Sequence, residues 1–137
     1  MLYAPHTVTD HDRVYAEPRH LIVDFAFDEQ VAQVFPDMIR RSVPGYGEVI
    51  ALLGLFAERY AQPGSRLYDL GCSLGAATLA MRRRLTAPDC RIVAVDNAEA
   101  MTGRCRGHVA ADGEGTPVDV VCADIRHVAV ADASVVA

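Results

Sequence analysis

Residues 67–78 read LYDLGCSLGAAT and residues 94–97 read AVDN, and these two runs carry the clearest structural signal of the chain. The first predicts a buried strand, a glycine-rich turn and the start of a helix, and the second predicts another strand that ends in an acid. The small residues of the turn let the backbone approach a ligand, and the helix N-terminus behind them offers free N–H groups. Asp96 lies 25 residues after Gly71, so its carboxylate can accept hydrogen bonds from ribose hydroxyls. The two runs therefore predict a βαβ unit that holds a nucleoside.

The hydrophobic pattern on either side of these runs alternates between helices and strands. Helices are predicted over residues 28–41, 46–60, 76–85 and 98–111, and strands over 66–70, 90–96 and 117–123, with a fourth strand beginning at Ser134. Pro36 should kink or split the first helix. The order indicates an α/β protein: the N-terminal part of a doubly wound, mostly parallel, Rossmann-like sheet, preceded by N-terminal helices. Because only three strands are complete, we expect residues 25–137 to form an incomplete nucleoside-binding domain, behind a flexible leader over residues 1–24.

Composition narrows the class of protein. The chain has 137 residues, of which 51% are hydrophobic, and a formal net charge of −5, so binding of a polyanion through bulk charge is not expected. The basic run Arg82-Arg83-Arg84 is better interpreted as the solvated end of a helix, where the helix dipole favours cations, than as an RNA contact. No segment has the roughly 18 apolar residues of a membrane span, and the N-terminus lacks the layout of a signal peptide. We therefore expect a cytoplasmic protein with no membrane partner.

The cysteines and histidines give no sign of a metal centre. The four cysteines, Cys72, Cys90, Cys105 and Cys122, include no Cys-x-x-Cys pair, so we expect no metal. They fall in a turn, on two strands and in a helix of the predicted pattern, which favours free thiols in a reducing compartment. For Cys72, a small residue packed under the turn is the simpler interpretation than a nucleophile. Three of the five histidines lie in the leader, where they indicate a polar tail.

Acidic and small residues gather where three successive strands end. They are Asp69, Gly71, Ser73, Gly75, Asp96, Asp124 and Ile125. Open α/β sheets bind ligands along this edge. Asp124 either caps a turn or accepts a hydrogen bond from the exocyclic amine of an adenine, whose ring nitrogen the Ile125 N–H could reach. Asp69 either orients the loop or reaches a ligand amine through water.

A second motif occupies the same turn. Gly71-Cys72-Ser73-Leu74-Gly75 also fits Gly-x-Ser-x-Gly, the nucleophile elbow of serine hydrolases, and His127 follows in the order Ser, Asp, His. Such hydrolases carry several strands and an oxyanion loop before the elbow, whereas only helices are predicted here. His127 also follows Asp124 too closely to be a triad partner on a separate loop. The hydrolase interpretation is therefore the weaker one.

Three segments together resemble one family. The turn and strand-end motifs, Asp69-Leu70-Gly71-Cys72-Ser73, Asp96-Asn97 and Asp124-Ile125, resemble those of class I S-adenosylmethionine-dependent methyltransferases. The segment FAFDEQVAQVFPDMIRRSVPGY, residues 25–46, is similar to the N-terminal segment of carboxy-S-adenosyl-L-methionine synthases, as are residues 68–78 and 122–127. The resemblance runs from about Asp24 to Ala137. It indicates an N-terminal fragment of a member of this synthase family.

The resemblance implies an unusual activity. Synthases of this family have the methyltransferase fold, but they convert S-adenosyl-L-methionine and prephenate to carboxy-S-adenosyl-L-methionine and release phenylpyruvate. A downstream enzyme uses the product to modify the wobble uridine of tRNA, so tRNA would be only an indirect partner. The resemblance also implies a homodimer. An ordinary S-adenosylmethionine-dependent methyltransferase remains the alternative.

The resemblance also implies roles for individual residues. Tyr46 would contact the amino-acid end of S-adenosylmethionine, and Gly71, Cys72 and Ser73 would line it through backbone groups. Asp96 and Asn97 would hold the ribose, and Asp124 and Ile125 the adenine. No catalytic group can be assigned, because the family's remaining contacts, which include an asparagine and an arginine, come after Ala137. We therefore expect the fragment to be inactive alone.

Overall fold

The computed structural model describes residues 27–132 and 135–136. Its elements are α1 (Glu29–Ser42), α2 (Tyr46–Tyr60), β1 (Arg66–Leu70), α3 (Ala76–Arg84), β2 (Arg91–Asp96), α4 (Glu99–Ala111), β3 (Val118–Cys122), a short 3-10 helix (Ile125–His127) and β4 (Val135–Val136). The helices and strands predicted from the sequence are confirmed, with ends that agree to within one or two residues. The predicted flexible leader, residues 1–24, lies outside the described residues.

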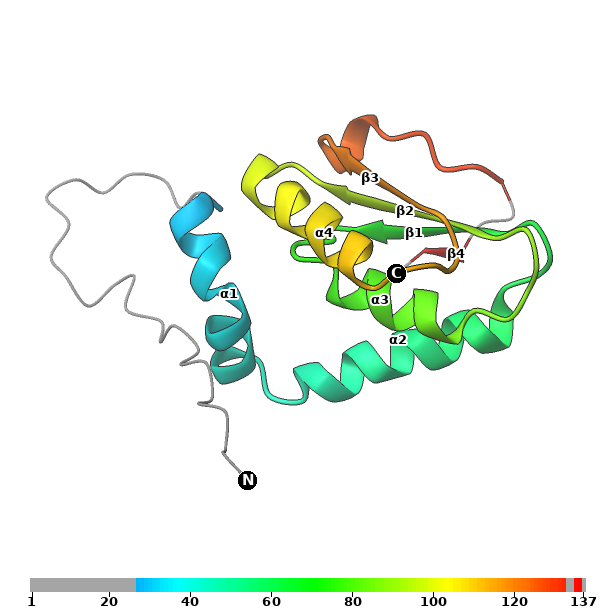
Figure 1. Cartoon of the computed structure of the whole chain (residues 1–137), viewed down its shortest axis with the longest axis horizontal. Helices are drawn as coiled ribbons and strands as arrows, with labels where there is room; N and C mark the ends of the chain where they lie inside the picture. Colours follow the sequence, from blue (N-terminus) through cyan, green and yellow to red (C-terminus); the bar gives the residue numbers. More distant parts are fainter. Residues whose placement is uncertain (1–26, 133–134, 137) are drawn as a thin grey trace, which may run out of the picture.

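The strands form one parallel sheet in the order β3-β2-β1-β4 (Figure 1). Leu67 in β1 pairs with Ile92 in β2 on one side and with Val135 in β4 on the other, and β2 pairs along its length with β3. The chain therefore moves outward from β1 to β3 and then returns to the far side of β1. This reversal is the switch point of a doubly wound sheet, and it confirms the predicted fold class.

Two apolar clusters join the helices to the sheet. Ala57 of α2 and Met81 of α3 pack with Leu67 and Ile92, and all four side chains are buried. A second cluster joins α1 to α4 through contacts among Val31, Phe35, Leu74 and Met101. Since Leu74 belongs to the turn after β1, the N-terminal helix packs directly against the glycine-rich loop.

The first helix begins as its sequence predicts but is not split. The side chain of Asp28 accepts a hydrogen bond from the backbone N–H of Val31 at 2.9 Å, which caps the helix. α1 continues through Pro36 to Ser42, so the predicted split is wrong. Proline removes one backbone donor, but the packing of Val31, Ala32 and Phe35 keeps both halves of the helix in place.

Much of the apolar face of α2 is exposed. The helix packs against α3 through Gly54 and Ala57, and a Cβ on Gly54 would stand 2.8 Å from the carbonyl oxygen of Ala80. Val49 is 53% exposed and Phe56 is 49% exposed, and Leu52 is exposed beside them. The helix therefore carries a wide apolar face, of which only the small residues Gly54 and Ala57 are buried within the described residues.

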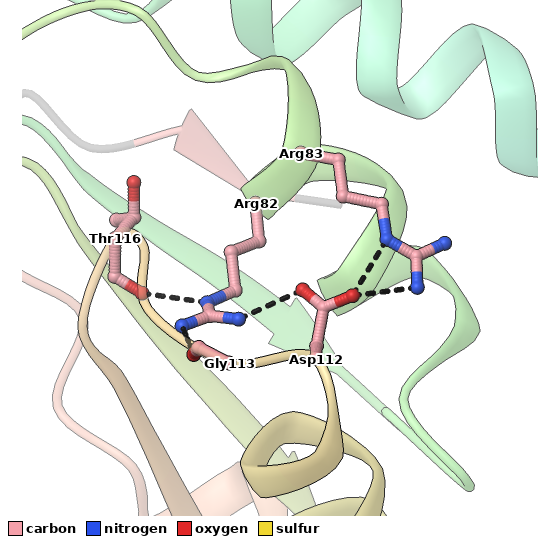
Figure 2. Close-up of polar contacts among 5 residues, drawn as sticks. All are labelled: Arg82, Arg83, Asp112, Gly113 and Thr116. Atoms are coloured by element: carbon pink, nitrogen blue, oxygen red, sulfur yellow. Dashed lines mark hydrogen bonds and ion pairs between the residues drawn. The ribbon is translucent and has the colours of Figure 1, made fainter.

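One of the three neighbouring arginines differs from the interpretation as a solvated helix end: Arg83 and Arg84 are exposed in the last turn of α3, as expected, but Arg82 is not. Arg82 is buried, with a side chain that is 6% exposed, and it pairs with Asp112 at 2.7 Å (Figure 2). Its guanidinium also donates to the carbonyl oxygens of Gly113 and Thr116. Asp112 accepts from Arg83 as well. Arg82 therefore ties the end of α3 to the loop between α4 and β3, a role that depends on residues 30 or more positions away.

Candidate functional site

The carboxyl ends of β1, β2 and β3 meet at one edge of the sheet and border an open cavity of about 400 Å³. Its lining residues are Gly71, Asp96, Asn97, Ala123, Asp124, Ile125 and Arg126. Five of the eight predicted cofactor-binding residues are therefore brought together. The N–H of Ala123, directly after β3, donates to the carbonyl oxygen of Asp96 at the end of β2 at 3.0 Å. This bond fixes the ends of β2 and β3 relative to each other.

The loop after β1 has a constrained backbone. The N–H groups of Gly71 and Cys72 both donate to the carbonyl oxygen of Val95 at 2.8 Å, which fastens the loop to β2. Gly71 and Ser73 take left-handed conformations, with φ values of 91° and 49°. A Cβ on Gly71 would meet nothing within 4 Å, so the space in front of this residue is open to a ligand.

The carboxylate of Asp96 organises the loop as well as facing the cavity. Its Oδ2 accepts from the N–H of Ser73 and its Oδ1 accepts from the N–H of Ala98, both at 2.9 Å. Each carboxylate oxygen can accept more than one hydrogen bond, so both keep acceptor capacity for hydroxyl groups. The sequence predicted the acid at this position but not its bond to the loop.

Asp124 caps a short turn and is paired with a cation. Its Oδ1 accepts from the N–H of Arg126 at 2.9 Å, and the Arg126 guanidinium binds both carboxylate oxygens. These bonds hold the pKa of Asp124 below its usual value. The capping role considered for Asp124 is confirmed, while Ile125, which is 49% exposed, offers an apolar surface next to it. Arg126 was not singled out from the sequence, although its place two residues after Asp124 allows this pairing.

Asp69 is a buried acid directly behind the loop. Its Oδ2 accepts from the hydroxyl of Thr78 at 2.6 Å and from the N–H of Thr78 at 3.0 Å. Burial raises the pKa of Asp69 above its usual value, although the bonds from Thr78 oppose the shift, and the charge of Asp96 adds to it. These contacts give Asp69 a structural role, because its carboxylate binds the first turn of α3, which follows the loop. Thr78 was not predicted as its partner.

Tyr46 begins α2 and lines a second cavity rather than the first. This cavity of about 240 Å³ is bounded by Phe35, Pro36, Ile39, Tyr46, Leu74, Ala76, Leu79 and His108. Burial raises the pKa of the Tyr46 phenol, and the charge of Asp69 raises it further, so the phenol stands within electrostatic reach of the acid behind the loop. The structure thus places Tyr46 on the helical side of the loop, apart from the five residues at the sheet edge.

Neither Cys72 nor Ser73 has the surroundings of a nucleophile. Cys72 is 4% exposed, and the pKa of its thiol is raised by interaction with Cys105, by burial and by the nearby carboxylates, so it stays protonated. Within the described residues, no histidine bonds to the Ser73 hydroxyl: His108 binds the Leu74 carbonyl, and His127 ends the short 3-10 helix. This geometry does not support the hydrolase interpretation.

The cysteines and helices also bear on the other sequence-based predictions. All four cysteines are free, as predicted, although Cys90 lies just before β2 rather than on it. The described residues hold no group of three or more His, Cys, Asp or Glu side chains placed to bind a metal. None of the described helices combines the length and apolarity needed to cross a membrane.

The glycine-rich loop, the acid after β2 and the parallel sheet with its switch point define a nucleoside-binding α/β domain. A family profile described as "Methyltransferase domain" matches residues 67–137. The chain therefore belongs to the methyltransferase domain family. The fold alone superposes with a TM-score of 0.59 on a protein of Methanococcus maripaludis assigned as an S-adenosyl-L-methionine-dependent methyltransferase. That match has 18% sequence identity and covers 77% of this chain and 46% of the other.

Curated relatives narrow the comparison to one group within the family. The chain is 61% identical over 126 residues to a carboxy-S-adenosyl-L-methionine synthase of Trichlorobacter lovleyi. The aligned region covers 91% of this chain and 52% of the relative. It is 58% identical over 125 residues to the synthase of the same name from Photobacterium profundum, covering 91% of this chain and 51% of that relative. These identities confirm the resemblance found in the sequence motifs. The chain spans about half the length of these relatives.

Proposed function

We propose that this chain provides the cofactor-binding part of a carboxy-S-adenosyl-L-methionine synthase, which converts S-adenosyl-L-methionine and prephenate to carboxy-S-adenosyl-L-methionine. The observation that carries the proposal is an identity of 61% to such a synthase over 91% of this chain. The cavity at the sheet edge supports it, because five residues with the expected roles line that cavity. The product would serve modification of the tRNA wobble uridine by another enzyme, so tRNA is proposed only as an indirect partner.

The residues at the sheet edge fit a nucleoside bound in an extended form. Asp96, with Asn97 beside it, would accept hydrogen bonds from the ribose hydroxyls through the free acceptor capacity of its two oxygens. The exposed side chain of Ile125 would pack on the adenine ring, whose amine would donate to Asp124. Asp96 and Asn97 lie at the end of β2, and Asp124 and Ile125 lie in the turn after β3. These two pairs would therefore meet the ribose and the base in turn along the sheet edge.

The loop and Tyr46 fit the other end of the cofactor. Gly71, Cys72 and Ser73 would face it with backbone groups, since the space in front of Gly71 is open. Tyr46 would approach the amino-acid end from α2. S-adenosyl-L-methionine would contribute a methyl group made reactive by its positively charged sulfur. The described residues would bind and orient this molecule, and we assign none of them to the reaction with prephenate.

The experiment for this proposal uses the full-length product of the gene, with any sequence that follows Ala137. We expect the purified protein to form carboxy-S-adenosyl-L-methionine from S-adenosyl-L-methionine and prephenate, detected by mass spectrometry, with release of phenylpyruvate. A protein that binds the cofactor but forms no carboxylated product from prephenate would instead favour the alternative, an ordinary methyltransferase. Absence of binding to S-adenosylhomocysteine would contradict both.

We also propose that the protein is a cytoplasmic homodimer. The four free cysteines support a reducing compartment. The exposed apolar side chains of α2, among them Val49, Leu52 and Phe56, support a covering partner. Light scattering coupled to gel filtration of the full-length protein tests the assembly. A dimer that the pair of substitutions Leu52→Glu and Phe56→Glu leaves intact would show that a different surface forms the contact.

A further inference from the structure

His108 connects the last turns of α4 to the glycine-rich loop after β1. Its Nδ1 lies 2.8 Å from the carbonyl oxygen of Leu74, a residue 34 positions earlier in the chain. Because a carbonyl oxygen only accepts, Nδ1 must carry the hydrogen and donate it. Among the described residues, the His108 ring is thus the side chain that satisfies this loop carbonyl, and it does so from behind the loop.

Cys105 touches the same loop from the same face of α4. It lies three residues before His108, which places both side chains on one side of the helix. Its sulfur stands 2.7 Å from the position that a Cβ on Gly75 would take, and Cys105 is fully buried. Two neighbouring peptides of the loop, at Leu74 and Gly75, are therefore supported by side chains of α4.

The loop needs this support because it acts through its backbone. Gly71, Ser73 and Gly75 all have positive φ values, and for Ser73 the left-handed conformation is one that side chains disfavour. The carbonyl of Val95 and the carboxylate of Asp96 hold the loop from the sheet side. The contacts of His108 and Cys105 hold it from α4. The path of the loop backbone depends on both sets of contacts.

We propose that His108 is a positioning residue of the cofactor site: it fixes the Leu74 peptide, and thereby the loop at residues 71–75, in the conformation that binds the cofactor. This inference rests on the function proposed above but assigns a role to a residue that does not line the cavity at the sheet edge. His108 acts through the loop and need not touch the reacting atoms.

Two substitutions of similar shape in the full-length protein separate the hydrogen bond from packing. His108→Leu removes the donor, and His108→Asn keeps an N–H donor close to the position of Nδ1. For S-adenosylhomocysteine, measured by calorimetric titration, we expect His108→Leu to weaken binding by about tenfold and His108→Asn by less than about threefold. Amide hydrogen exchange of residues 72–76 should be faster in His108→Leu alone.

A matched control comes from the same helix. Arg104 forms an ion pair with Glu29 of α1 on the outside of the protein. Arg104→Leu therefore removes a polar contact of α4 but no contact with the loop. We expect Arg104→Leu to leave the affinity for S-adenosylhomocysteine unchanged.

Three results would overturn or redirect the inference. If His108→Leu lowers the melting temperature but binds S-adenosylhomocysteine as tightly as the unmodified protein, His108 is a structural residue only and the proposal is wrong. If His108→Leu does not fold, His108→Asn and His108→Asp form a second pair of equal shape, and equal affinities in that pair contradict the proposal. If the unmodified protein does not bind the ligand, the proposed function fails, and hydrogen exchange at the loop still decides whether His108 holds it.

Discussion

The backbone N–H of Ser73 donates a hydrogen bond to Oδ2 of Asp96 at 2.9 Å. This bond joins the glycine-rich loop after β1 to the acid that ends β2, across 23 residues of sequence. The same carboxylate caps the peptide of Ala98 through its other oxygen. Asp96 therefore shapes the loop before any ligand is bound, and substitutions at this position should affect both the loop and the ligand.

Replacement of Asp96 tests the ribose assignment. In the full-length protein, Asp96→Ala removes the two charge-assisted bonds proposed to ribose hydroxyls, each worth roughly 1.5–3 kcal/mol, and it also frees the N–H of Ser73. We expect the affinity for S-adenosylhomocysteine to fall by at least about tenfold. Asp96→Asn keeps one acceptor oxygen, so its affinity for S-adenosylhomocysteine should lie between that of the unmodified protein and that of Asp96→Ala. Calorimetric titration measures both, and an unchanged affinity in Asp96→Ala would refute the ribose role.

Replacement of Ser73 separates a binding loop from a nucleophile. Ser73→Ala keeps the backbone N–H that binds Asp96, so a loop that works through its backbone should retain most of its synthase activity. A serine nucleophile would lose nearly all of its activity. The assay is formation of carboxy-S-adenosyl-L-methionine by mass spectrometry. A loss of about 10³-fold or more in a variant of intact fold would restore the hydrolase interpretation.

Asp69 should make stability depend on pH. Burial raises the pKa of Asp69 in the folded state, so the charged form is less stable in the protein than in the unfolded chain. The contribution of Asp69 to the free energy of unfolding is therefore most favourable below its pKa in the unfolded chain, about 3.9. That contribution is lost as the pH rises through the pKa of Asp69 in the folded protein. Asp69→Asn removes the charge and keeps an oxygen for both donors of Thr78.

The measurement for Asp69 is the melting temperature from pH 3 to pH 8 in about ten steps, for both proteins, with the ionic strength held constant. We expect Asp69→Asn to melt at a higher temperature than the unmodified protein at neutral pH, and the advantage to shrink as the pH falls. A difference between the two proteins that stays constant over the whole range would contradict the role of burial.

Two neighbouring arginines should differ in their effect on stability. Arg82→Met removes a buried cation, so Asp112 and two carbonyl oxygens each lose a hydrogen-bond partner (Figure 2). We expect the free energy of unfolding to fall by about 3 kcal/mol. Arg84→Met is the matched control, because Arg84 pairs with Glu58 where both side chains are exposed, and it should cost less than about 1 kcal/mol. Urea unfolding measures both changes. Equal losses would show that the buried network of Arg82 stabilises the fold no more than the exposed pair of Arg84 and Glu58.

The order of elements and the position of the site followed from the sequence. The glycine-rich turn after a buried strand, and the acid 25 residues later, are local patterns, and parallel strands place their carboxyl ends at one edge. The turns and apolar periods that indicate the ends of α2, α3 and β1 are also local. For this reason Gly71, Asp96, Asp124 and Ile125 could be assigned to one edge of the sheet from local patterns, and the resemblance to the synthase family added Asn97; all five line the cavity.

Contacts between distant segments were decided only by the tertiary structure. No local pattern indicates that Arg82 is buried, because its partners at residues 112, 113 and 116 come after another strand and another helix. The same is true of the bond from His108 to Leu74, and of the position of Tyr46 on the other side of the loop from the sheet edge. Periodicity reports which residues share a face of one element, whereas these contacts depend on how two elements pack, and packing is a property of the folded chain as a whole.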